Sequence, residues 1–107
     1  MKINFSKTVL TDIDGNPVKD SEGKPVPTDY KFLANAIFGA SYDQIGIANL
    51  DKLEMAQKIN RGEAIDLETK EQELLKNFIN RLQGANGYHA TAWAKEFENE
   101  KDKVRKD

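Results

Sequence analysis

Carboxylate side chains gather near the N-terminus, between residues 12 and 22. They belong to Asp12, Asp14, Asp20 and Glu22. Carboxylates at close spacing can bind Ca²⁺, yet an EF-hand loop aligned on Gly15 lacks both its first acid and its terminal glutamate. Acids beside glycines are also typical of solvent-exposed turns, and we prefer that interpretation. We predict no metal ligand and no cofactor; the alternative is a small carboxylate-based metal-dependent enzyme, or a Ca²⁺-binding protein, that uses these turns.

Other residues capable of catalysis are few. The chain contains one histidine, His89, and no cysteine. A lone histidine cannot build the usual zinc site, and without cysteine there is neither a disulfide nor a thiolate nucleophile. No serine or carboxylate stands at a spacing that would pair it with His89, and Asp66 and Glu68 suit the start of a helix. We therefore predict no catalytic residue and a protein that is not an enzyme.

Three aromatic side chains near the C-terminus are the candidate partner-binding residues. Tyr88, Trp93 and Phe97 share a stretch that is poor in large aliphatic residues. The three preceding helices carry enough leucine, isoleucine and phenylalanine to close a small core among themselves and with the predicted hairpin. Part of the aromatic surface is then left over, and exposed Trp and Tyr side chains are favoured binding anchors. The alternative is that Trp93 covers the core.

The same aromatic side chains could stack on nucleic-acid bases, but the charges oppose that function. Only Lys95 lies among them, followed by Glu96 and Glu98, and the whole chain has a net charge of −2. Nucleic-acid binders need a basic surface, so we do not expect a nucleic-acid partner. No apolar run approaches the ~20 residues of a membrane span, and the N-terminus lacks the apolar stretch of a signal peptide. We expect a soluble, cytoplasmic protein.

The periodicity of apolar residues predicts the elements that position these side chains. Ile3, Phe5 and Val9 alternate with polar residues, and an Asp14-Gly15 turn favours a β-hairpin or meander over residues 2–26. Helical spacing then predicts helices over about residues 29–38, 50–61, 69–83 and 88–97. Strands followed by helices indicate an α+β fold, an N-terminal hairpin or meander followed by a bundle of three to four short helices.

The boundaries and the core follow from the same pattern. A chain of 107 residues predicts a single domain, over residues 1–97, and the charged segment 98–107 is expected to be disordered. Thr28, Asn49 and Thr69 are the predicted helix caps. The predicted centre of the core is the stripe Leu74, Phe78, Ile79 and Leu82, packed on Phe32, Ile37, Leu53 and Ile59.

Taken in order, these segments resemble small proteins encoded by tailed phages and prophages. The resemblance covers about residues 1–83. It is carried by an MKINF strand, a DIDG turn, an LANAIF helix, a KLEMAQKI helix and the segment IDLETKEQELLKNFI. Trp93 and the charged tail have no counterpart in that group. The resemblance implies a phage-derived protein that binds something inside a bacterial host or in the virion, and it transfers no functional residues.

We therefore expect a non-enzymatic protein–protein interaction module of phage or prophage origin, either structural and morphogenetic or host-regulatory. Its partner would be a host or phage protein, with self-association as a further expectation. The expected location is the bacterial cytoplasm or the virion.

Overall fold

Two isoleucines far apart in the sequence build the sheet of this protein. The structure is a computed structural model that describes residues 1–82, 84 and 87–106, with side chains as far as Glu98. Strand β1 (Lys2–Ile3) pairs antiparallel with β2 (Ile65–Asp66), and Ile3 lies opposite Ile65. Both isoleucines are buried, whereas their neighbours Lys2 and Asp66 are exposed, as the alternation of a half-buried strand requires.

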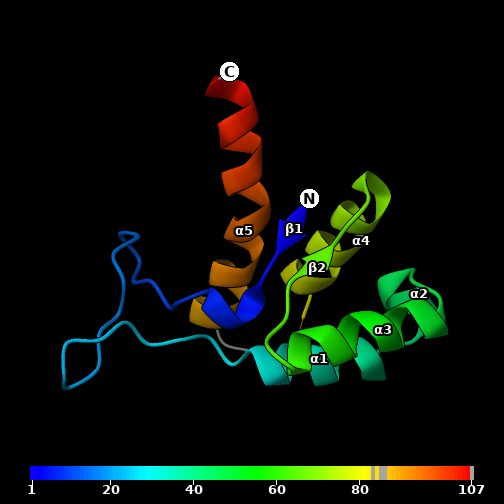
Figure 1. Ribbon diagram of the computed structural model, residues 1–107, viewed down its shortest axis with the longest axis horizontal. Helices are drawn as coiled ribbons and strands as arrows, with labels where there is room; N and C mark the ends of the chain where they lie inside the picture. The colour runs from blue at the N-terminus through cyan, green and yellow to red at the C-terminus, as the bar shows by residue number, and fades with distance from the viewer. Residues whose placement is uncertain (83, 85–86, 107) are drawn as a thin grey trace.

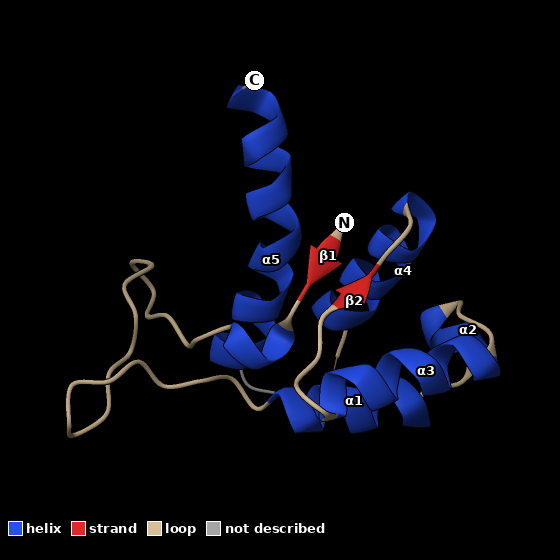
Figure 2. Ribbon diagram, in the orientation of Figure 1, coloured by secondary structure: helices blue, strands red, loops and turns tan. Residues whose placement is uncertain are grey.

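The rest of the described chain is mainly helical (Figures 1 and 2). The elements outside the sheet are the 3₁₀ turn η1 (Phe5–Lys7) and helices α1 (Tyr30–Gly39), α2 (Tyr42–Ile45), α3 (Asn49–Asn60), α4 (Thr69–Asn80) and α5 (Gly87–Lys106). Helix α1 packs on α3, and α4 packs on α2 and α5. The result is a small compact domain, and none of its described helices is long and apolar enough to cross a membrane.

The predicted N-terminal hairpin over residues 2–26 is wrong. After Ile3 the side chain of Asn4 accepts a hydrogen bond from the Ser6 amide and caps η1, which turns the chain out of the strand. Asn4 and Ser6 also donate to the carbonyl oxygen of Gly62, so the turn is fastened to the loop after α3. Strand β1 is therefore left to pair with the distant β2.

Residues 8–28 form an extended arm that projects to one side of the helices (Figure 1). Three of its residues, spaced eight apart, close a ring of backbone hydrogen bonds. Val18 donates to Leu10, Val26 donates to Val18, and Leu10 donates to Val26, at 2.8–2.9 Å. The arm contains two Asp-x-x-Gly-x-Pro-Val turns, and a leading aspartate caps each. The sequence signalled both turns, but the closure of three segments into a ring is not a hairpin.

Helices α1, α3 and α4 lie close to their predicted positions, but their caps differ from the prediction. Asp29 caps α1 by accepting a hydrogen bond from the Phe32 amide at 3.1 Å. Thr28, the predicted cap, is buried instead. Ala48 precedes α3 and Glu68 precedes α4, so Asn49 and Thr69 are the first helical residues rather than caps. Helix α4 ends at Asn80, three residues before the predicted end.

The core lies among the sheet and helices α1, α3, α4 and α5. Phe78, Ile79, Ile37 and Ile59 are buried as predicted. Leu75 is fully buried, whereas Leu74 and Leu82 are only half-buried. Phe32 is at the border of exposure, and Leu53 is half-buried. The prediction placed the stripe of α4 about one residue away from its observed centre, because helical spacing alone does not distinguish Leu74 from Leu75.

The segment after α1 contains a helix that the sequence did not reveal. Helix α2 (residues 42–45) lies between the predicted helices over residues 29–38 and 50–61. The Ser41 amide donates to the side chain of Gln44 at its start, and Gly46 ends it in the left-handed conformation. Nearby, the buried ammonium of Lys52 donates to the carbonyl oxygen of Ala40, the residue that ends α1. A cation at this position satisfies an orphan carbonyl and complements the helix dipole.

Helix α5 is longer than the predicted segment 88–97, because its helical backbone continues to Lys106. Its last turns project beyond the other elements (Figure 1). The side chains beyond Glu98 and the residue at 107 lie outside the described part. The expectation that segment 98–107 is disordered in solution stays a prediction.

Candidate interaction surface

Two of the three predicted contact residues lie in the core. The Trp93 indole is fully buried, and its Nε1–H donates to the Thr28 hydroxyl at 2.9 Å. That hydroxyl in turn donates to the carbonyl oxygen of Thr8 at 3.2 Å. Phe97 is also buried, with its ring centroid 6.5 Å from that of Phe5. Trp93 and Phe97 therefore hold α5 against the N-terminal segment, so in this fold neither is available as an exposed anchor.

His89 also serves to place the first turns of α5. Its Nδ1 accepts a hydrogen bond from the Asp29 amide at 3.1 Å. Its ring lies 5.8 Å from that of Trp93, centroid to centroid. The hydrogen bond ties α5 to the start of α1 and favours the tautomer protonated at Nε2.

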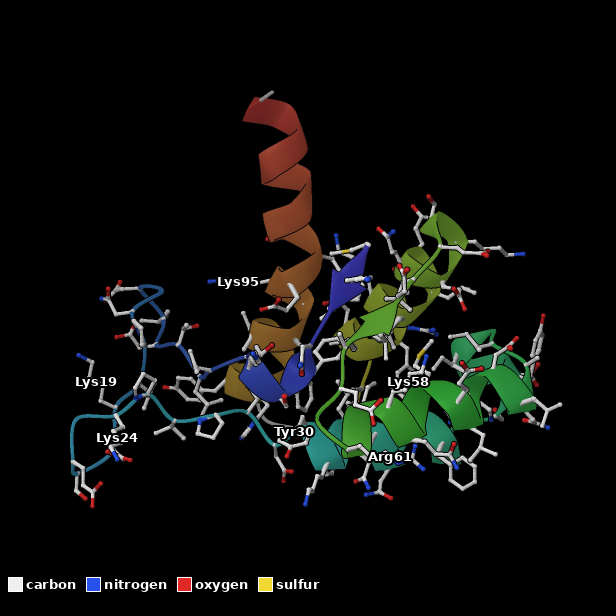
Figure 3. The ribbon with its side chains drawn as sticks, viewed as in Figure 1. Lys19, Lys24, Tyr30, Lys58, Arg61 and Lys95 are labelled. Atoms are coloured by element: carbon white, nitrogen blue, oxygen red, sulfur yellow. The ribbon has the colours of Figure 1, made fainter. Side chains whose placement is uncertain are left out.

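Tyr88, the third predicted residue, is exposed and lines a groove between the arm and α5. The groove has a volume of about 410 Å³. Its walls are formed by Thr11, Asp12 and Ile13 of the arm and by Gly87, Tyr88, Thr91 and Lys95 of α5. Lys95 extends from the side of α5 that faces the arm (Figure 3). We call this feature the arm–α5 groove.

Ile13 is the residue of this groove that the sequence analysis missed. It is 96% exposed, and Tyr88 is 54% exposed. A large aliphatic side chain at the tip of a tight turn is unusual, because turn positions favour Gly, Pro, Asn, Asp and Ser. Its position between the two aspartates of the DIDG turn could have indicated an exposed apolar side chain, but the sequence analysis considered only the acids of this turn, as metal ligands or turn residues.

The carboxylates of residues 12–22 are used largely to shape the arm. One oxygen of Asp12 accepts from the amides of Asp14 and Asn16 at 3.0 and 2.9 Å. The second turn repeats this arrangement, with one oxygen of Asp20 accepting from two amides at 2.8 and 3.0 Å. Within residues 1–98, apart from the gaps at 83 and 85–86, no three acidic or histidine side chains converge in a way that could hold a metal ion.

A second, larger pocket lies where the C-terminal ends of α1, α2 and α4 meet, with a volume of about 510 Å³. Arg81 lines it and is fixed there by donating to the carbonyl oxygens of Asn77 and Gln44, at 3.2 and 3.0 Å. These bonds close the last turn of α4 and bind it to α2. Arg81 thus has a structural role that accounts for its position.

Comparisons of the chain with protein-family models, with curated proteins and with solved structures gave no match. Function is therefore inferred from the arm–α5 groove and from the residues that line it.

Proposed function

We propose that this protein is a non-enzymatic protein–protein interaction module whose contact surface is the arm–α5 groove. The observation that carries the proposal is the pair Ile13 and Tyr88, two large side chains exposed on the two walls of one groove. Exposed apolar side chains that lie close together on an ordered scaffold are typical of interaction sites, whereas single ones are common on any surface. Tyrosine is also among the residues enriched in binding hot spots.

The chemistry of the described side chains supports binding rather than catalysis. The groups best suited to act on a substrate already have structural roles, since His89 accepts from the α1 segment, Asp12 caps its turn, and Arg81 closes α4. Among the described residues that line the groove, neither threonine hydroxyl is hydrogen-bonded to Asp12 or Lys95, whereas an acyl- or phosphoryl-transfer enzyme needs a nucleophile paired with a base. The resemblance to phage and prophage proteins makes a protein of the bacterial host, or a phage structural protein, the expected partner.

Site-specific photo-crosslinking tests the proposal. The photoreactive residue p-benzoyl-phenylalanine is placed at Thr91, inside the groove, or at Gln57, an exposed position on α3. In a bacterial host lysate, the label at position 91 should capture a defined protein that the label at position 57 does not. Mass spectrometry then identifies the captured protein.

The captured protein must then bind the purified chain through the groove. Combining Ile13→Asp with Tyr88→Ala should abolish that binding without changing the melting temperature, because both side chains are exposed. Leu50→Asp is the matched control, since Leu50 is 81% exposed but lies on α3, outside the groove. Equal capture from positions 57 and 91, or full binding by the double variant, would show that the groove is not the contact surface.

A further inference from the structure

One edge of the arm carries unused backbone hydrogen-bonding groups. Val9 faces Pro27 and Thr11 faces Pro17 in antiparallel bridges. The hydrogen bonds of these bridges come from the flanking residues, for example Leu10 to Val26 and Thr28 to Thr8. In such non-hydrogen-bonded pairs the N–H and C=O groups of the facing residues point outward, away from the partner segment. The backbone groups of Val9 and Thr11 make no hydrogen bond to any residue that the structure describes.

The two other segments of the ring are closed to strand pairing. The ring repeats every eight residues, so Val9 corresponds to Pro17 and Pro25, and Thr11 corresponds to Lys19 and Pro27. The backbone groups of these four residues face away from the ring. Proline has no N–H to donate, and prolines and lysines on an edge strand discourage pairing with another chain. Only the first segment, at Val9 and Thr11, keeps both donors and both acceptors on its outer edge with no proline or lysine there.

The open edge borders the arm–α5 groove. Thr11 belongs to both features, and Ile13, in the turn that follows, also lines the groove. The opposite wall is formed by Tyr88, Thr91 and Lys95, which are spaced as one stripe along α5. Lys95 forms no ion pair with another residue of the described chain. The groove therefore has Thr11, next to the unpaired backbone edge, on one wall, and Tyr88 and the Lys95 cation on the other.

We propose that the partner contributes an extended peptide segment that adds as a strand to the Val9–Thr11 edge; this inference rests on the proposed function. Backbone hydrogen bonds would supply affinity, and alternate side chains of the segment would enter the groove. We expect the bound peptide to place a β-branched or aromatic side chain between Ile13 and Tyr88. We also expect the peptide to carry a carboxylate that pairs with Lys95.

Prolines at the corresponding repeat positions show how to block the edge. Val9→Pro imitates Pro17 and Pro25, and Thr11→Pro imitates Pro27, so the ring already accommodates proline at each position. Each variant removes one outward N–H and none of the ring's hydrogen bonds. Lys19→Pro, on the outward edge of a segment remote from the groove, is the matched control. Circular dichroism and thermal melts confirm that each variant folds.

The test uses a displayed library of random short peptides, selected on the immobilised wild-type protein, with one enriched peptide then synthesised. It should bind Thr11→Pro about tenfold more weakly than the wild type and Lys19→Pro with unchanged affinity. N-methylation along the peptide should weaken binding at alternate residues only, as pairing with one strand edge requires. If the enriched peptide carries a carboxylate, Lys95→Glu should weaken its binding more than Lys31→Glu, a control substitution at an exposed position on α1.

Several results would overturn strand addition. They are the absence of any enriched peptide, equal affinity for wild type and Thr11→Pro, or weakening by N-methylation with no alternation. If the crosslinked partner at position 91 is nevertheless lost in the Ile13→Asp, Tyr88→Ala variant, the proposed function stands and only the mode of binding is wrong. Concentration-dependent dimerisation that Thr11→Pro abolishes would replace the partner peptide with a second copy of the chain.

Discussion

At the scale of single residues, the bond between Trp93 and Thr28 is the first to test. The indole N–H and the hydroxyl oxygen meet in a fully buried setting, 2.9 Å apart. Trp93→Phe should lower the free energy of unfolding by about 1–3 kcal/mol, since it leaves Thr28 without its donor. Urea denaturation measures this loss. In a Thr28→Val background the same change should cost less, and an equal cost in both backgrounds would contradict the coupling.

Gly46 tests backbone conformation and close packing together. Its φ is +77°, and a Cβ there would lie 2.8 Å from a terminal methyl carbon of Leu74. Gly46→Ala should cost about 1–2 kcal/mol for the left-handed backbone and about 1 kcal/mol more for the contact. Gly15→Ala is the control, because Gly15 has a φ of +89° with nothing within 4 Å of its Cβ. Equal losses in thermal melts of the two variants would show that Leu74 moves aside freely.

At the scale of elements, the rotation of α4 decides which leucine supports the core. Leu75 is fully buried, and Leu74 is half-buried beside Gly46. Leu75→Ala should therefore cost about 2–5 kcal/mol, the range for deleting a buried leucine side chain, and Leu74→Ala clearly less. Chemical denaturation of the two variants compares them directly. A greater loss for Leu74→Ala would restore the stripe inferred from the sequence.

The end of α5 provides a second test at this scale. Residues 98–107 contain equal numbers of acidic and basic side chains and one apolar residue, Val104. Such a segment has almost no apolar area to offset the entropy of ordering it. Deleting residues 99–107 should leave the melting temperature nearly unchanged while lowering the helical signal in circular dichroism. A marked drop in the melting temperature would mean that the segment docks on the domain.

Across the whole molecule, local signals predicted three of the helices, α1, α3 and α4, closely, but they did not predict α2 or the pairing of distant segments. The stripes of α1, α3 and α4 repeat within a few residues, so the sequence revealed them. The pairing of Ile3 with Ile65 leaves no local trace, and a strand of two residues is too short to show a period. Thr28 resembles a helix cap in the sequence, and it is a buried hydrogen-bond acceptor only because Trp93 of α5 packs against it.

The candidate site divides in the same way. Tyr88 was predicted from its residue type and is exposed in the groove. Trp93 and Phe97 had the same residue class, but their burial depends on where α5 lies, and the sequence does not fix that position. The open edge at Val9 and Thr11 could be recognised only after the three segments of the arm were seen to close into a ring.

The dependence of Thr28 and Phe5 on the last helix has a consequence for synthesis. Thr28 meets Trp93 across 65 positions of sequence, and Phe5 meets Phe97 across still more. A ribosome makes the N-terminal partners first, so they have no partner until α5 emerges. Contacts between distant segments also form slowly, and apolar surface left exposed meanwhile favours aggregation. The nascent chain can assemble α1 on α3 early, but the contacts of Thr28 and Phe5 with α5 can form only after Trp93 and Phe97 have left the ribosome.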